Sequence, residues 1–286
     1  MKFSVYQSSR IGGRKYNQDR AAYAYTEEAL LLVLADGMGG HLHGEVAAEI
    51  AVRTYMRAFE QIAHTRVAEP AKFLAETMHD AHNAIVGYAQ QQQLGGNPGT
   101  TCVAALLQDG LVYWAHAGDS RIYLLRDGAT AAVTHDHSVV QQWADWGIIS
   151  ADEMKTHPDR NKITNCLGGV GELFYAEPTA AMPLQPGDVV LLCSDGLSTP
   201  LSDVEVASGF LTAPLETALK QLMDVAVNRV GARADNTTAV VARWGDGEDA
   251  HAAPAPVCVV LDLNELESES DILGRTLAGM KPFSPV

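Results

Sequence analysis

Three short apolar segments, each leading into an aspartate beside a glycine or serine, restrict the fold of this chain more than any other feature. Short continuous apolar runs bounded by turn signals are typical of buried strands. An Asp-Gly pair taken alone indicates only a turn. Aspartates at several strand ends can, however, converge at one edge of a compact core. The three segments are residues 29–35 before Asp36, residues 111–117 before Asp119, and residues 189–193 before Asp195.

The order of the expected elements favours an antiparallel α+β architecture over a βαβ one. The pairs Asp109-Gly110 and Asp127-Gly128 predict hairpin turns between neighbouring strands. Strands and helices therefore come in blocks instead of alternating. The expected helices are 44–63, 69–92, 215–230 and a polar, mainly helical stretch at 136–162, and the expected strands are 29–35, 100–107, 111–117, 121–125, 189–193 and 237–244.

A shift in composition after Trp244 predicts the end of one domain. Residues 245–256 are rich in Gly, Asp, Ala and Pro, as linkers are. Residues 257–263 are apolar enough to add one strand to a sheet edge or a partner, or to form a loosely packed appendage. We therefore expect a domain over residues 1–245, followed by a linker and tail over residues 246–286.

Charge and composition exclude several classes of protein. The net charge of −15 and the pI near 5.0 argue against binding to a nucleic-acid backbone, which needs a basic surface. The four cysteines form no CxxC pair, so neither a zinc site nor a redox motif is indicated. The chain starts without an apolar signal segment and has no apolar run long enough for a membrane span. We expect a cytoplasmic protein.

The aspartates that follow the apolar runs suggest a site for hard divalent cations. A fourth one, Asp235, stands beside Asn236 ahead of the last expected strand. Magnesium and manganese prefer oxygen ligands, and paired cations assist hydrolysis of phosphate esters. Arg14, five residues before Asp19, is a candidate for holding the phosphate with its planar fork, although spacing alone also fits a solvated surface charge.

Six motifs in this chain resemble the ordered motifs of the PP2C, or PPM, phosphatases, and the bacterial branch fits best. The similarity runs from about residue 4 to residue 243. No single motif is specific, but their order and approximate spacing are. The motifs are residues 14–19, 36–40, 99–101, 118–121, 194–196 and 235–236.

The resemblance implies a four-layer α-β-β-α sandwich, in which two antiparallel sheets are flanked by helices and a metal cluster lies in a cleft at one end. It implies hydrolysis of phosphoserine and phosphothreonine on proteins by attack of metal-bound hydroxide. It also implies phosphorylated proteins as partners and a pathway in which the enzyme reverses a bacterial Ser/Thr kinase. We expect a monomer that binds no nucleic acid and has no membrane span.

The cofactor implied by the resemblance is Mn²⁺ or Mg²⁺, with two or three ions per chain. Asp36 would bridge two ions, and Gly37 would offer its carbonyl to one of them. Asp195 and Asp235 would ligate the other ion. Asp19 would support the cluster directly or through water.

The remaining implied roles concern a third ion, the substrate and the proton donor. Asp119 matches the position of a third, weaker ion, Arg14 matches the phosphate-holding arginine, and Asn236 would orient Asp235 or a bound water. Some relatives carry histidine after the Asp-Gly pair, where this chain has Met38, which cannot donate a proton. Metal-bound water is the replacement we expect, and His41 is a weaker candidate.

Residues 136–168 resemble the flap beside the active site of bacterial members. Asn165 stands where arginine is common, which bears on substrate preference more than on chemistry. The histidines of this segment are irregularly spaced, which favours a surface flap over a zinc site.

Two other functions compete with this interpretation. Carboxylates and magnesium also serve nucleases and small-molecule phosphoesterases. A pseudophosphatase could instead bind a phosphoprotein without turnover. The acidic charge argues against a nuclease, and the presence of all four predicted core aspartates argues against a pseudophosphatase.

Overall fold

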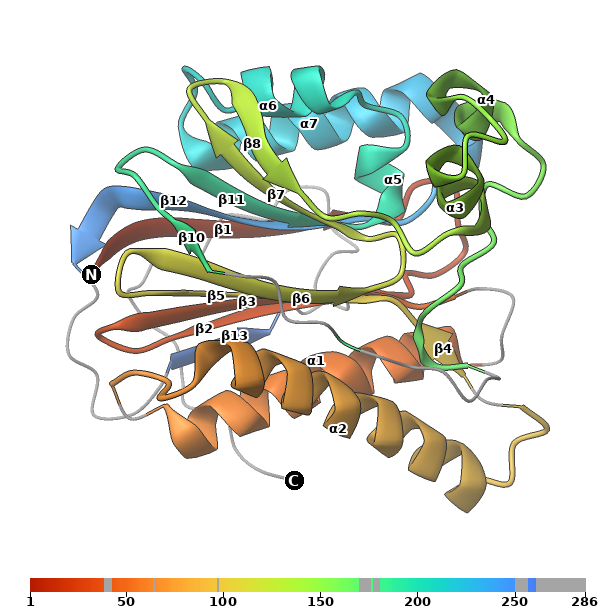
Figure 1. Cartoon of the computed structure of the whole chain (residues 1–286), viewed down its shortest axis with the longest axis horizontal. Helices are drawn as coiled ribbons and strands as arrows, with labels where there is room; N and C mark the ends of the chain where they lie inside the picture. The colour runs from red at the N-terminus through yellow and green to blue at the C-terminus, as the bar shows by residue number, and fades with distance from the viewer. Residues whose placement is uncertain are drawn as a thin grey trace.

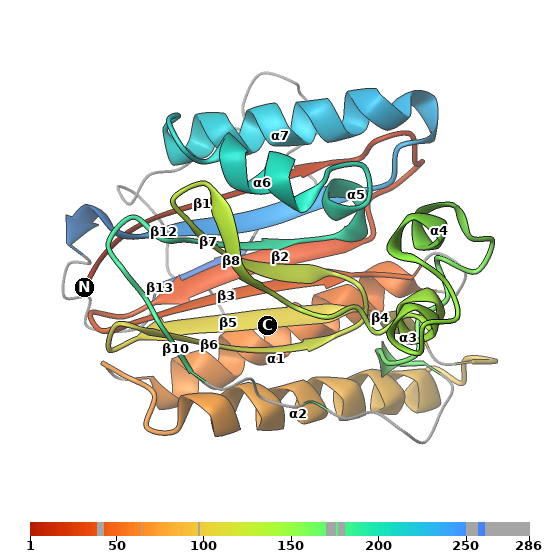
Figure 2. The ribbon, with the colours of Figure 1, turned by 45° about the horizontal axis from the view of Figure 1, so that its top comes forward.

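Two antiparallel sheets pack face to face in this chain, and helices cover both outer faces (Figures 1 and 2). The computed structural model describes residues 1–38, 43–63, 65–96, 98–169, 176, 181–249 and 257–260. The first sheet has the order β1 (Lys2–Arg10), β12 (Thr237–Asp249), β11 (Val189–Cys193), β7 (Arg121–Arg126), β8 (Ala129–Val133). The second sheet has the order β10 (Met182–Pro183), β6 (Leu111–Ala117), β5 (Cys102–Gln108), β3 (Ala29–Asp36), β2 (Asp19–Tyr25), β13 (Val257–Val260).

The helices divide between the two outer faces and one end of the molecule. Helices α1 (Gly44–Ile62) and α2 (Pro70–Gln91) cover the second sheet. Helices α5 (Asp195–Ser198), α6 (Asp203–Gly209) and α7 (Leu215–Val230), with the short 3-10 helix η1 (Gly231–Arg233), lie on the first sheet. Helices α3 (Val139–Asp145) and α4 (Ala151–Thr156) stand at one end, near the small ladder of β4 (Gly99–Thr100) and β9 (Leu167–Gly168).

Three apolar cores separate the four layers. Strand β3 shows why its sequence is continuously apolar: Leu30, Leu32 and Leu34 enter the core between the sheets, whereas Leu31 and Val33 face α1 and α2. Because successive side chains of a strand point to opposite faces, a strand buried on both sides must be apolar throughout. The expected four-layer α-β-β-α sandwich is confirmed.

Several local expectations need correction. The stretch at 136–162 is not one helix; it forms α3 and α4, with Gly147 in a left-handed turn between them (φ 69°). Ser138 caps α3, and Ser150 forms a capping box with Glu153 in α4. The expected strand at 100–107 breaks at Thr101 between β4 and β5.

The last part of the sequence also differs from the expected linker. Strand β12 continues to Asp249 instead of ending at 244, because its extension pairs with Lys2 of β1. The expectation that the apolar tail segment can add a strand to a sheet edge is confirmed for Val257–Val260, which form β13 and pair with β2. The functional boundary at residue 245 stays a prediction. None of the helices in the described ranges has the length and apolar character needed to cross a membrane.

Candidate metal centre and phosphate site

Two of the predicted aspartates lie opposite each other at one end of the second sheet. Strand β2 begins with Asp19, and its antiparallel neighbour β3 ends with Asp36, so the two residues are paired in register. Each strand is held in place by the apolar cores on its two faces. The sheet register therefore brings together two carboxylates that come from different motifs of the sequence.

Backbone contacts fix the turn that follows Asp36. Thr101 donates its N–H to the Asp36 carbonyl at 2.9 Å, and its Oγ1 accepts the Asp36 N–H at 3.0 Å. A Cβ on Gly37 would lie 2.4 Å from the Gly44 carbonyl oxygen, where no side chain fits. The glycine after Asp36 is thus required because α1 begins directly against it.

The same argument explains the glycine after Asp195. A Cβ on Gly196 would lie 2.1 Å from the Asn236 carbonyl oxygen. The missing side chain lets the turn after β11 approach the segment that carries Asp235. Two predicted ligands from distant parts of the sequence meet through this contact.

Asp19 is fully buried, and only one of its two carboxylate oxygens is hydrogen-bonded. Its Oδ2 accepts a hydrogen bond from Ser194 Oγ at 2.9 Å, and Ser194 Oγ in turn accepts one from the Thr238 N–H at 3.0 Å. Its Oδ1 has no hydrogen-bond partner among the described residues. A buried carboxylate oxygen without a partner is costly, and a cation would satisfy it.

Arg14 and Asp235 form an ion pair beside this cluster, with Arg14 Nη2 at 2.5 Å from Asp235 Oδ2. The side chain of Asn236 accepts the Gln18 N–H at 2.9 Å and donates to the Ile11 carbonyl at 2.9 Å. It therefore secures the loop that carries Arg14. Asn236 contacts the Asp235 carboxylate through its backbone, whose N–H donates to Asp235 Oδ1 at 2.8 Å.

Burial and mutual repulsion raise the pKa values of the clustered carboxylates. Burial, followed by the charges of Asp19, Asp195 and Asp119, raises the pKa of Asp36 well above its usual range. Burial also raises the pKa of Asp19 to about 6, and burial with the charge of Asp136 raises the pKa of Asp119 to about 6. Like charges in one buried cluster indicate a missing positive partner.

The donor set fits hard divalent cations. It consists of carboxylate and backbone oxygens, and the unpartnered Asp19 Oδ1 adds an acceptor that no described residue satisfies. No three acidic, histidine or cysteine side chains in the described segments stand close enough to enclose an ion by themselves. Magnesium and manganese commonly keep several waters, so a site with few protein ligands per ion suits them.

The position after the Asp-Gly pair has a packing role. Met38 donates its N–H to the Gly99 carbonyl at 3.0 Å, and a Cβ on Gly99 would lie 2.4 Å from Met38 Cε. The thioether therefore lies over the glycine of the next motif. His41 lies outside the described residues, so its candidacy as proton donor stays a prediction.

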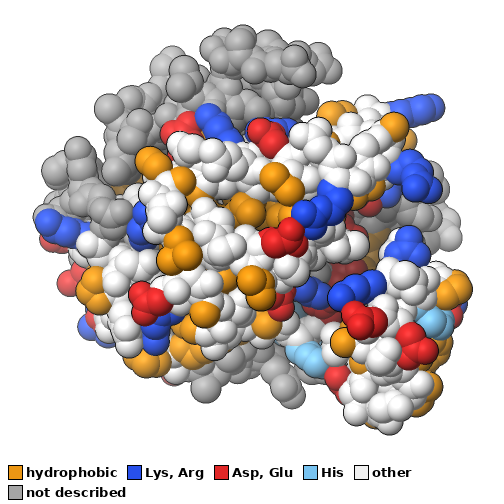
Figure 3. Space-filling model, turned by 90° about the horizontal axis from the view of Figure 1, so that it is seen from above, with side chains coloured by type: hydrophobic (Ala, Val, Ile, Leu, Met, Phe, Trp, Pro, Cys, Tyr) orange, Lys and Arg blue, Asp and Glu red, His pale blue; other side chains and the backbone are white. Residues whose placement is uncertain are grey.

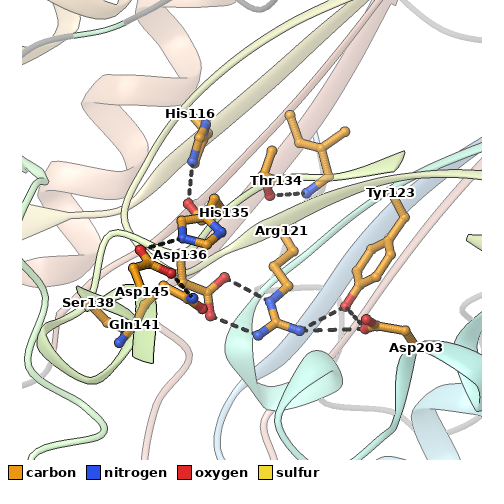
Figure 4. A network of polar contacts seen from close by, with 11 residues as sticks. His116, Arg121, Tyr123, Thr134, His135, Asp136, Ser138, Gln141, Asp145 and Asp203 are labelled. Atoms are coloured by element: carbon orange, nitrogen blue, oxygen red, sulfur yellow. Dashed lines mark hydrogen bonds and ion pairs between the residues drawn. The ribbon is translucent and has the colours of Figure 1, made fainter. Parts of the chain in front are cut away.

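Hydrogen bonds join the start of the flap and the residue before it to strands β6 and β7 (Figure 4). Arg121 holds Asp136 with two hydrogen bonds of 2.8 Å, through Nε and Nη2. On the other side, His116 Nε2 lies 2.8 Å from the His135 carbonyl oxygen. Figure 3 shows acidic and basic side chains gathered where the lobe at the lower right meets the rest of the molecule.

Arg121 also reaches the first turn of α6. It donates to the Tyr123 hydroxyl at 3.1 Å, and that hydroxyl donates to Asp203 at 3.0 Å. Sequence reasoning missed this network and Ser194, although Arg121 and Ser194 both stand inside motifs already recognised. Their partners lie far away in the sequence, so only the fold reveals the contacts.

Replacing Arg121 with lysine should loosen the base of the flap. Lysine cannot make the two-pronged contact with Asp136, so we expect KM for a phosphopeptide to rise about fivefold to twentyfold with a smaller change in kcat. Arg126→Lys is the matched control, because Arg126 makes the same two-pronged contact with Asp188 at the far end of β7. Equal kinetic effects of both substitutions would contradict this role for Arg121.

Stabilisation by manganese should depend on pH. A carboxyl whose folded-state pKa is raised from 3.8 to about 6, as for Asp19, stabilises the metal-free fold below about pH 4 and loses that contribution as the pH rises through 6. Cations bind the ionised form, so manganese should raise Tm more at about pH 7.5 than at about pH 5. Thermal unfolding with and without Mn²⁺ at both values checks this, and equal shifts would contradict it.

Comparisons with known proteins agree with this arrangement. The family Protein phosphatase 2C matches residues 6–230, well over half of the chain. Serine/threonine phosphatase Stp of Listeria innocua is 34% identical over 195 residues, which cover 68% of this chain and 77% of that protein.

Solved structures share the fold. Serine/threonine phosphatase Stp1 from Staphylococcus aureus has a TM-score of 0.76 at 30% identity, covering 86% of this chain and 96% of its own. The catalytic domain of serine/threonine protein phosphatase PstP, solved in complex with two manganese ions, has a TM-score of 0.71 at 30% identity and covers 84% and 97%. The sequence match and the shared architecture lead to one conclusion: this chain belongs to the protein phosphatase 2C family.

Proposed function

We propose that this chain removes phosphate from phosphoserine and phosphothreonine side chains of proteins, with Mn²⁺ or Mg²⁺ as cofactor and two or three ions per chain. The enzyme class follows from the family, whose bacterial relatives at 31–36% identity are named as protein or serine/threonine phosphatases. The observation that carries the proposal is that aspartates from separate segments, with Asp19 fully buried among them, act on one another electrostatically beside the half-exposed Arg14.

The residues have separate tasks in this proposal. Asp36, the Gly37 carbonyl, Asp195 and Asp235 would hold the ions, and Asp19 would support the cluster. Such ions lower the pKa of a coordinated water and neutralise charge on phosphoryl oxygens.

The remaining tasks lie at the rim of the site. Asp119 would hold a third ion. Arg14 is half-exposed and paired with the Asp235 carboxylate, and its guanidinium group would bind the substrate phosphate. Asn236 would keep the Arg14 loop in place. Met38 cannot donate a proton, so coordinated water is the proposed donor to the leaving alkoxide.

The cellular setting is proposed from the family and the sequence. The partners would be phosphorylated proteins, including a Ser/Thr kinase and its substrates. We further propose a cytoplasmic monomer with the catalytic residues confined to residues 1–245. The charge of −15 argues against nucleic acid as the substrate.

A substrate panel tests the proposal against the other metal-dependent hydrolases. Phosphothreonine and phosphoserine peptides, a nucleotide, a sugar phosphate and single-stranded DNA would be offered with Mn²⁺ at equal concentration. We expect kcat/KM for the peptides to exceed the others by about tenfold or more. Faster turnover of the nucleotide or sugar phosphate would identify a small-molecule phosphoesterase, and no turnover of any substrate would identify a pseudophosphatase.

A further inference from the structure

Strand β2 would be the edge of its sheet if residues 257–260 were absent. The sheet order ends with β2 and β13, and β13 pairs with β2 in the register Val257 to Tyr25 through Val260 to Ala22 (Figure 1). Exposed edge strands normally carry charges, proline or bulges that prevent pairing with other chains. Residues 21–25 of β2, Ala-Ala-Tyr-Ala-Tyr, contain none of the charged or proline residues that protect an edge. The sequence of β2 is therefore typical of a strand whose edge is paired with another strand.

The side chains of β13 match both faces of the sheet. Val259 is 8% exposed and enters the core between the two sheets, in the cluster that holds Tyr23 and Tyr25. Cys258 and Val260 face the other way and pack on the core beneath α1 and α2. Burial and the nearby carboxylate of Glu60 on α1 raise the pKa of the Cys258 thiol, which keeps it neutral in this contact. An alternating segment of this kind is what strand addition requires.

The covering strand is separate from the elements that define the family. It lies beyond residue 243, where the resemblance to the family ends, and follows β12 only after residues 250–256, a segment of Ala and Pro with one His. Its ladder is four residues long, at the short end for strands. A short strand on a separate connection can leave and return without unfolding the rest of the sheet.

We propose that the edge of β2 is a strand-addition site for an extended apolar segment, which this chain fills with its own residues 257–260 as a detachable strand. The backbone of β2 supplies the binding energy, and the position of Val259 between the sheets sets the register. Strand β2 begins with Asp19, and the tail pairs with residues 22–25 at the opposite end of the same strand.

Hydrogen exchange on the full-length protein tests the proposal. Val259→Asp puts a charge where the core is apolar, so it should release the tail and speed exchange about tenfold or more at those backbone amides of residues 22–25 that point to β13, and not at those that bond to β3. A synthetic peptide of residues 255–263, added to this variant, should restore protection of the amides that point to β13, whereas the same peptide with aspartate at position 259 should not. Unchanged exchange in the variant, or no effect of the wild-type peptide, would overturn the proposal.

Two controls keep the result interpretable. Val204→Asp makes the same change at a 76% exposed position on α6 and should leave residues 22–25 protected. If Val259→Asp fails to fold, Val259→Ala should still speed exchange at these amides, and no change there would overturn the proposal.

Light scattering at several concentrations identifies the source of the strand. A wild-type dimer that Val259→Asp dissociates would assign the strand to a second copy and overturn the assignment to the same chain. The exchange measurement needs neither metal nor phosphate, so its outcome is independent of the proposed function.

Discussion

Replacing Asp36 with asparagine should lower kcat/KM for a phosphothreonine peptide by about a thousandfold or more. Asp36 lies opposite Asp19, and the charges of Asp19, Asp195 and Asp119 act on it. In the proposed role of Asp36, loss of its carboxylate removes several kcal/mol of electrostatic stabilisation from the metal site, and about 4 kcal/mol corresponds to that factor. Calorimetry should show manganese binding at least about tenfold weaker.

Asp109→Asn is the matched control for this substitution. Asp109 also precedes a glycine, but it stands in the hairpin between β5 and β6 with φ 55° and pairs with Arg66 at the surface. We expect activity and manganese affinity to stay within about twofold of the wild type. Similar losses in both variants, or full activity of Asp36→Asn, would contradict the role of Asp36.

Replacing Arg14 with alanine should lower kcat/KM by about a hundredfold. Charge-assisted hydrogen bonds from a guanidinium to phosphate contribute about 1.5–3 kcal/mol, and 2.7 kcal/mol is about a factor of a hundred. Arg14→Lys should be intermediate because lysine lacks the fork. Steady-state kinetics on the same phosphopeptide, with inorganic phosphate as a competitive inhibitor, measures the effect.

The contact of Arg14 with Asp235 adds a second expectation. If Asp235 ligates a cation as proposed, Arg14 competes with that cation for the carboxylate, and manganese should bind Arg14→Ala at least as tightly as the wild type. Lys15→Ala removes a neighbouring positive charge from the same loop and should leave kcat/KM within about threefold. Loss of manganese binding in Arg14→Ala, or equal kinetic effects of the two substitutions, would contradict a phosphate-holding role.

Elements with strong local patterns could be predicted from the sequence. The apolar run at 29–35 and the helical spacing at 215–230 correspond closely to β3 and α7. Strand β8 was missed because its residues alternate between exposed and half-buried positions and carry only a weak apolar signal. The length of β12 depends on pairing with the first residues of the chain, which no local pattern reveals.

The Asp-Gly dipeptide alone does not distinguish the pairs proposed for the metal site from those that only form turns. Asp109 and Asp127 adopt positive φ in hairpins, whereas Asp36 ends a buried strand and Asp195 begins α5. The sequence shows the same dipeptide in all four places; the preceding apolar runs indicated which pairs end strands, and the resemblance to a family assigned their roles. The contacts of Ser194 with Asp19, and of Arg121 with Asp136, depend on the meeting of segments far apart in the chain.

The most direct test of the central claim is phosphate release from a phosphothreonine peptide by the full-length protein, with Mn²⁺ and then with excess chelator. The buried acidic cluster predicts turnover with Mn²⁺, loss of at least about 99% of it with chelator, and recovery when Mn²⁺ is restored. Turnover that persists in chelator, in both the wild type and Asp36→Asn, would contradict a metal-dependent phosphatase built on these aspartates.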